Sequence, residues 1–70
     1  MKLRAVVARN LRVLRKLKGF TQEEFADLAG INRNYVGQIE REEKSPTVDM
    51  IEKLAIVLSV QPAELLNNRH

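Results

Sequence analysis

Residues 22–41 constrain the fold most, because this segment has the pattern of two short helices joined by a tight turn. Thr21 precedes the first helix and Glu24 follows three residues later, which is the arrangement of a capping box. Gly30 can adopt a left-handed backbone conformation without steric cost, so it ends the first helix. Asn32 is a suitable N-cap for the second. The sequence therefore predicts two helices that meet at Gly30.

The second helix of this pair separates apolar from polar side chains. Its polar face carries residues at helical spacing: Arg33, Asn34, Gly37, Gln38 and Arg41. Arginine makes paired hydrogen bonds to guanine, and Asn and Gln make them to adenine. A merely solvated face is more often built from Glu and Lys, and this one has no acid. We therefore predict that Arg33, Asn34 and Gln38 contact base edges, with Arg33 reading guanine.

The residues around this helix pair extend the pattern over most of the chain. Small or apolar side chains stand where such a pair must pack: Phe25, Ala26, Ile31, Val36 and Ile39. The flanking segments 14–22, 45–48 and 65–66 agree with the same pattern. On these residues the chain resembles the phage repressor and Cro-like helix-turn-helix family, over about residues 7–66.

This resemblance implies an all-α fold: a compact five-helix lambda-repressor-like DNA-binding domain spanning residues 1–70, with its helix-turn-helix at 22–41. It also implies a sequence-specific DNA-binding transcriptional regulator whose residues 32–41 enter the major groove of double-stranded DNA. One such helix covers too few base pairs to be specific alone, so we expect a homodimer on a palindromic operator. The resemblance suits a small autoregulating repressor or activator.

Several further contacts follow from the resemblance and from charge. The family's Gln at the start of the motif contacts a phosphate, and we expect the same of Gln22. Asn32 is a fourth base-contact candidate, although capping competes for its side-chain oxygen. The Tyr35 hydroxyl either contacts a phosphate or packs inside. Basic side chains near the motif are expected to contact phosphates and position the protein without reading sequence: Arg41, Lys44 and Lys16.

The resemblance also implies one structural ion pair and one departure in a loop. Arg15 is expected to pair with Glu40, which would tie the first helix to the third. Glu42 stands where the family usually has Gly, just after the recognition helix. Because a non-Gly residue with positive φ is costly, we expect the loop of residues 42–46 to adopt another geometry. Ser59 replaces a second Gly of the family, at the end of the fourth helix.

Three more helices are predicted, over residues 3–18, 48–58 and 62–67. Thr47 is an N-cap for the fourth helix and Pro62 suits the first position of the fifth. An apolar arc on the first helix faces the core: Leu3, Val6, Val7, Leu11, Val13, Leu14 and Leu17. In the motif's first helix, Phe25, Leu28 and Ala29 face inward. In the fourth helix the core face consists of Val48, Ile51, Leu54, Ala55 and Leu58.

A group of apolar side chains near the carboxyl end is left over from this core. Ile56 lies almost opposite the core face of its helix. We expect it to form a subunit contact together with its apolar neighbours: Val60, Leu65 and Leu66. The alternative function is a protein-interaction module, such as an antitoxin-type partner, with secondary DNA binding. A possible protein partner would then use this patch.

Composition limits the other classes of function. Residues 1–19 hold seven basic and no acidic side chains, and the rest of the chain holds five basic and nine acidic ones, so one face should meet an anionic partner. The chain has no cysteine and one histidine, His70. We therefore expect no metal site, no cofactor and no enzyme activity.

A membrane role is also not expected. No apolar run reaches the roughly 20 residues that span a bilayer. The basic amphipathic first helix could lie on a membrane surface, but a chain of 70 residues needs its apolar arc for the core. The amino end lacks the sustained apolar stretch of a signal peptide, so we expect a cytoplasmic protein.

Overall fold

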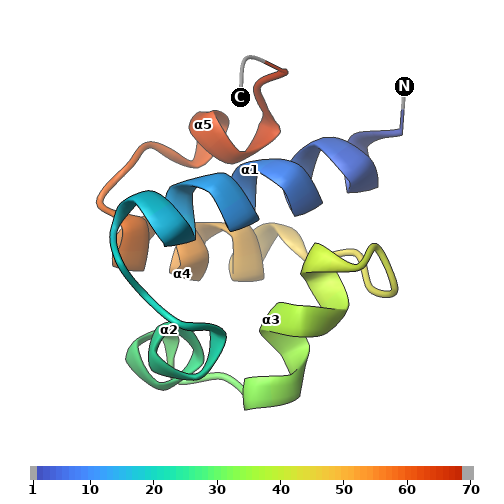
Figure 1. The fold of residues 1–70 in the computed structure, drawn as a ribbon. Coiled ribbons are helices and arrows are strands. Elements are labelled where there is room, and N and C mark those ends of the chain that lie inside the picture. The colour runs from blue at the N-terminus through green and yellow to red at the C-terminus, as the bar shows by residue number, and fades with distance from the viewer. Residues whose placement is uncertain (1, 69–70) are drawn as a thin grey trace.

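The computed structural model describes residues 2–68, which form helices and connecting loops with no strand. There are five helices in this part of the chain: α1 (Leu3–Leu17), α2 (Gln22–Ala29), α3 (Arg33–Glu40), α4 (Val48–Leu58) and α5 (Pro62–Leu66). Figure 1 shows α1 crossing the middle of the molecule, with α5 along one side and the α2–α3 pair on the other. The predicted all-α, five-helix fold is confirmed.

The predicted caps set the boundaries of the central helix pair. The Glu24 backbone N–H donates to Thr21 Oγ1 over 3.0 Å, and the Thr21 N–H donates to Glu24 Oε1 over 2.9 Å, so the capping box is complete. Gly30 ends α2 with φ of 70°. Asn32 Oδ1 then accepts the Asn34 backbone N–H at 2.8 Å and starts α3.

Helices α4 and α5 also begin where the sequence predicts. Thr47 Oγ1 accepts the Met50 backbone N–H at 3.1 Å, and α4 has the predicted bounds. Pro62 occupies the first turn of α5. Helices α1 and α5 each end one residue earlier than predicted, because helix ends fray.

The core lies between α1, the α2–α3 pair and α4. Its buried side chains come from all five helices: Val7, Leu11, Leu14, Phe25, Ala26, Val36, Ile39, Ile51, Leu54, Ala55, Leu58 and Leu65. Because apolar burial is the main favourable term in folding, this cluster fixes how α2 and α3 are presented. α3 contacts both α1 and α2, so its inner side is held on two flanks.

Four apolar side chains expected in the core are exposed instead. Leu3 begins α1, Leu17 ends it and Val48 begins α4, so all three extend past the neighbours that would cover them. Leu28 lies outside the inward arc of α2, which is centred between Phe25 and Ala26 rather than on Phe25. Hydrophobic periodicity predicted the helices correctly, but at these four positions it predicted burial for side chains that are exposed.

The expected subunit contact at Leu65 is wrong, because this side chain is fully buried. Hydrogen bonds from Asn10 account for the orientation of α5 that buries Leu65. Asn10 is buried on α1, and the two N–H groups of its Nδ2 are shared among three backbone carbonyls at the end of α5, those of Glu64, Leu65 and Asn67, at 3.2, 2.9 and 2.7 Å. These bonds satisfy carbonyls that a helix end leaves unpaired, and they fix the rotation of α5.

The expectation of a different loop geometry at Glu42 is also wrong. Glu42 has φ of 64°, which is the left-handed conformation that Gly normally provides, and Ser59 has φ of 58°. After α3, the Glu42 N–H donates to Ile39 O at 3.0 Å and the Glu43 N–H donates to Gln38 O at 2.8 Å. These bonds satisfy carbonyls at the helix end, so the turn keeps its shape despite the unfavourable residue.

Candidate nucleic-acid interface

The turn between α2 and α3 fixes the angle at which α3 is presented. The Ile31 N–H donates to Ala26 O at 3.0 Å, and the Gly30 N–H donates to Asp27 O at 3.2 Å. This is the hydrogen-bond pattern of a Schellman motif. α3 starts at Arg33, directly after this turn, so its first residues project from a rigid corner.

A buried polar network holds the other end of α3. Arg15 Nε donates to Glu40 Oε2 at 2.7 Å and Nη2 to Oε1 at 3.0 Å, with side chains only 8% and 4% exposed. Arg15 Nη1 also donates to the Phe20 carbonyl at 2.8 Å, and Gln22 Nε2 donates to Glu40 Oε1 at 3.1 Å. The structure therefore brings the expected pair together, and Gln22 joins it from α2.

The N-cap and the first turn of α3 carry three polar side chains that are all exposed: Asn32, Arg33 and Asn34. The Asn32 side-chain oxygen accepts the capping hydrogen bond, so its amide N–H groups are what remains for a base. Asn34 is exposed and its backbone is already bonded. The base-contact candidates Asn32, Arg33 and Asn34 thus lie together at one corner of the molecule.

Arg33 is held by two acids of α2. Its Nε and Nη2 donate to the two oxygens of Asp27 at 3.2 and 3.1 Å, and its Nη1 donates to Glu23 Oε2 at 2.8 Å. The side chains of all three residues are more than half exposed. The hydrogen bonds to Asp27, with the charges of Asp27 and Glu23, raise the pKa of Arg33 above its ordinary value. The guanidinium is therefore oriented although it lies at the surface.

Gly37 is not part of the open face that helical spacing predicted. A Cβ at this position would lie 2.8 Å from Arg41 Nη1 and 3.3 Å from Gln22 Oε1, so these two side chains cover the glycine. Gln38, next along the helix, is half-buried. The middle of α3 is thus occupied by the protein's own side chains, and the exposed face is divided into two ends.

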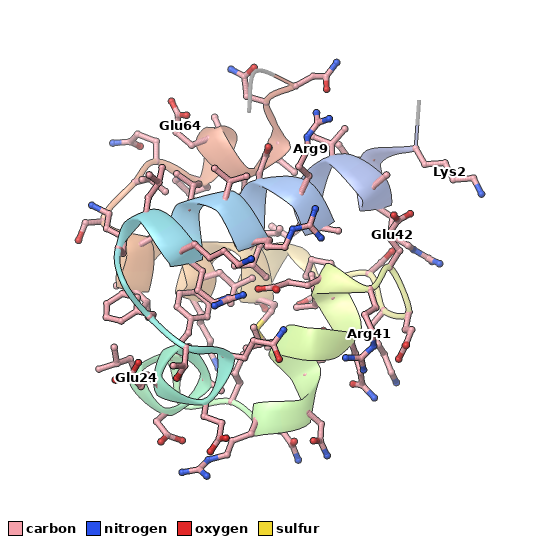
Figure 2. The ribbon with its side chains drawn as sticks, in the orientation of Figure 1. Lys2, Arg9, Glu24, Arg41, Glu42 and Glu64 are labelled. Carbon is pink, nitrogen blue, oxygen red and sulfur yellow. The ribbon has the colours of Figure 1, made fainter. Side chains whose placement is uncertain are left out.

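The second exposed end contains Arg41 and Lys44. Arg41 Nε donates to Glu43 Oε2 at 2.7 Å, and this hydrogen bond lowers the pKa of Glu43 below its usual range. Lys44 is exposed in the following loop. Figure 2 shows Arg41 at the opposite edge of the molecule from Glu24 of α2.

The remaining phosphate-contact candidates differ in accessibility. Tyr35 is half-buried and packs against the core cluster, which matches its packing alternative. Lys16 is exposed on α1. Within residues 2–68 no group of three or more His, Cys, Asp or Glu side chains could hold a metal ion. The same residues contain no helix long and apolar enough to cross a membrane.

The subunit-contact candidates do not form one patch. Ile56 is 71% exposed and Leu66 is 43% exposed, whereas Val60 is half-buried against the core. Leu66 lines a groove of about 410 Å³ between the start of α1, the start of α4 and α5. We call this the apolar groove, after its principal lining residues: Leu3, Val48, Ile51, Pro62 and Leu66. Ile56 is not among its lining residues.

Two acidic neighbours of Arg33 were not predicted from the sequence. Glu23 and Asp27 are separated from Arg33 by ten and six positions, and they lie on a different helix. No helical period links such spacings, so the contact follows only from the angle between α2 and α3. The one available signal was that Glu23 and Asp27 stand four residues apart, which places them on one face of α2.

The fold and the exposed corner of α3 define a class of protein. A helix-turn-helix family model matches residues 11–65, and the chain therefore belongs to the helix-turn-helix family. This confirms the predicted resemblance and the predicted function class, DNA-binding transcription regulation. The named relatives are regulators rather than enzymes.

Two relatives show 44% identity to this chain. One is a hypothetical transcription factor of Neisseria meningitidis, aligned over 64 residues that make up 91% of this chain. The chain spans 60% of that relative's length. The other is the uncharacterized HTH-type transcriptional regulator YazB of Bacillus subtilis, aligned over 57 residues, which are 81% of this chain and 83% of YazB.

Solved structures agree with the fold. The hypothetical transcription factor NHTF from Neisseria superposes with a TM-score of 0.92 at 42% identity, covering 94% of this chain and 76% of NHTF. The restriction-modification controller protein C.AhdI from Aeromonas hydrophila superposes with a TM-score of 0.85 at 40% identity, covering 89% of this chain and 94% of C.AhdI.

Proposed function

We propose that this chain is a sequence-specific transcriptional regulator that binds a palindromic operator as a homodimer, with residues 32–41 in the major groove. The observation that carries the proposal is the corner formed by Asn32, Arg33 and Asn34. These side chains are exposed, and their helix is held by the buried pair of Arg15 and Glu40. Rigid presentation of base-reading groups is what groove recognition requires.

The dimensions of the molecule suit this role. α3 has eight residues, and an α-helix with its side chains is about 10–12 Å across, which fits a major groove about 12 Å wide. The protein measures 30 × 23 × 20 Å. A homodimer on a palindromic operator would need its two α3 helices about one turn of DNA apart, near 34–36 Å.

Phosphate contacts would come from residues around this corner. Lys44 follows α3 in an exposed loop, and Lys16 is exposed on α1. Arg41 lies at the end of α3 and would have to leave Glu43, or share it, to reach a phosphate. Gln22 keeps one N–H on its amide beyond the one donated to Glu40, so it can serve both the network and a phosphate.

DNA binding is tested by selecting sites from a random pool and measuring affinities by fluorescence anisotropy over a range of salt. Arg33→Ala should lower the preference for the selected base about 5- to 150-fold. Lys16→Ala should weaken all sequences alike and reduce the salt slope by about one. If both variants bind all DNA as the wild type does, a protein-interaction module is the better description.

The apolar groove is the surface that best supports a dimer. Leu3, Val48 and Leu66 are exposed along it, with Arg4 on one wall and Asp49 and Glu52 on another. In a two-fold interface each copy offers the same patch to the other, so Arg4 of one copy can meet the acids of its partner. Charges of both signs around an apolar centre therefore favour a second copy of this chain as the occupant.

Sedimentation equilibrium distinguishes the two candidate surfaces. Val48→Asp changes a side chain that is 85% exposed, so it should leave the fold intact and shift the protein from dimer to monomer. Ile56→Asp is the matched control, because Ile56 is exposed on the same helix but outside the groove. If Ile56→Asp alone dissociates the dimer, the groove assignment is wrong.

A further inference from the structure

The contacts around Arg33 hold its guanidinium and leave part of its hydrogen-bonding capacity unused. Asp27 accepts two parallel N–H groups from Arg33, and Glu23 accepts a third. An arginine has five N–H donors, so one remains on Nη1 and one on Nη2, since no further bond to Arg33 occurs among residues 2–68. Two donors are what the O6 and N7 acceptors of guanine require.

The two acids are fixed as well as exposed. Glu23 and Asp27 stand one helical turn apart, so both side chains project from the same face of α2 toward the start of α3. The Schellman bonds at Gly30 hold α2 and α3 at a constant angle. The plane of the guanidinium is therefore set before any ligand arrives, which reduces the conformational freedom that binding must remove.

We propose that Asp27 is a specificity-determining positioning residue: it holds the Arg33 guanidinium in the orientation that reads guanine and stays bonded to it in the DNA complex, with Glu23 in a supporting role. This inference rests on the proposed function, because it assumes that Arg33 faces a base. It goes further by assigning part of the base preference to a residue of α2 that touches no base itself.

The proposal has a consequence for overall affinity. Carboxylates beside the major groove of DNA repel its phosphates, so Asp27 and Glu23 should weaken binding to DNA of every sequence. They should at the same time keep Arg33 from turning toward a nearby phosphate. The acids thus lower the affinity for all DNA and raise the discrimination between bases. A purely structural role would not produce these two opposite effects.

Anisotropy titrations on the selected site and on the same site with the Arg33-dependent base replaced provide the test. Asp27→Asn should reduce discrimination at that base about 5- to 10-fold, while affinity for random DNA rises about twofold to fivefold. Glu23→Gln should show the same changes in smaller degree. Asp27→Glu should restore part of the discrimination because it restores the carboxylate.

Glu24→Gln is the matched control. It removes one acid from the same helix, and Gln can replace Glu in the capping box with Thr21. Its discrimination should equal that of the wild type. In an Arg33→Ala background, Asp27→Asn should have no further effect on discrimination at this base.

The outcomes separate this inference from the proposed function. If Arg33→Ala loses discrimination and Asp27→Asn retains it, the positioning role is refuted and the regulator function stands. If the wild type shows no base preference, or if Arg33→Ala keeps it, base reading by Arg33 is refuted and the positioning role falls with it. Loss of discrimination in both variants, with Glu24→Gln unchanged, supports the inference.

Discussion

The two ends of α3 are each tied to a neighbouring helix by an arginine and a carboxylate, but in opposite surroundings. At the carboxyl end, Arg15 and Glu40 are almost fully buried, and Gln22 completes their hydrogen bonding. At the amino end, Arg33 and Asp27 are more than half exposed. Burial decides what the same chemistry does, because a buried charge cannot lose its partner without a large penalty, whereas an exposed one can turn to water.

Removing one partner of the buried pair tests this contrast most strongly. Glu40→Ala should reduce the free energy of unfolding by about 3–5 kcal/mol, because the Arg15 guanidinium would remain buried and unpaired. Urea unfolding followed by circular dichroism gives the measurement. The double variant Arg15→Met, Glu40→Leu should be more stable than either single variant. A loss below about 1 kcal/mol for Glu40→Ala would mean that solvent reaches the pair.

The turn after α3 offers a change in the opposite direction. Glu42→Gly should raise the free energy of unfolding by about 1 kcal/mol, because φ of 64° is unfavourable for a side chain. Lys44→Gly is the control in the same loop. Lys44 does not have positive φ, so this change should destabilise the protein slightly. Urea midpoints of both variants decide the sign.

Removing the carboxylate at the exposed end should hardly affect stability. Asp27→Ala is expected to change the melting temperature by less than about 3 °C, since exposed ion pairs contribute little. Differential scanning calorimetry at low and high salt provides the measurement. A larger loss would show that the Arg33 contact is structural, and the contrast between the two ends of α3 would disappear.

The pair of Arg41 and Glu43 predicts the smallest effect. Arg41 lowers the folded-state pKa of Glu43, so the pair stabilises the folded state at pH values above the unfolded pKa of Glu43. This contribution is lost as pH falls through the lowered, folded-state pKa. An NMR titration of the Glu43 carboxyl should show the shift, and Arg41→Gln or high salt should abolish it.

Much of the fold could be predicted because the helix boundaries depend on residues that are close in sequence. Thr21, Asn32 and Thr47 each mark a helix start by a side chain that bonds its own helix, and such caps need no tertiary information. The wrong predictions concern burial, which depends on tertiary packing. Leu28 and Val48 satisfy helical spacing, yet their exposure depends on which helix lies above them.

The candidate site divides in the same way. The residues of the exposed corner could be named from side-chain chemistry and helical spacing. Their interactions could not, because the contact of Arg33 with Asp27 arises where two helices cross. Gly37 shows the same limit: spacing placed it on the open face, but Arg41 and Gln22 fold over it. Long side chains can cover neighbours that a helical projection shows as open.

The amide of Asn10 has a consequence for how the chain comes apart. It joins α1 to carbonyls more than fifty positions further along the sequence, and α5 has only five residues. Because a helix this short is not stable by itself, α5 forms only when α1 is in place. Helices α1 and α5 should therefore unfold and refold together, as one cooperative unit that joins the two ends of the described chain.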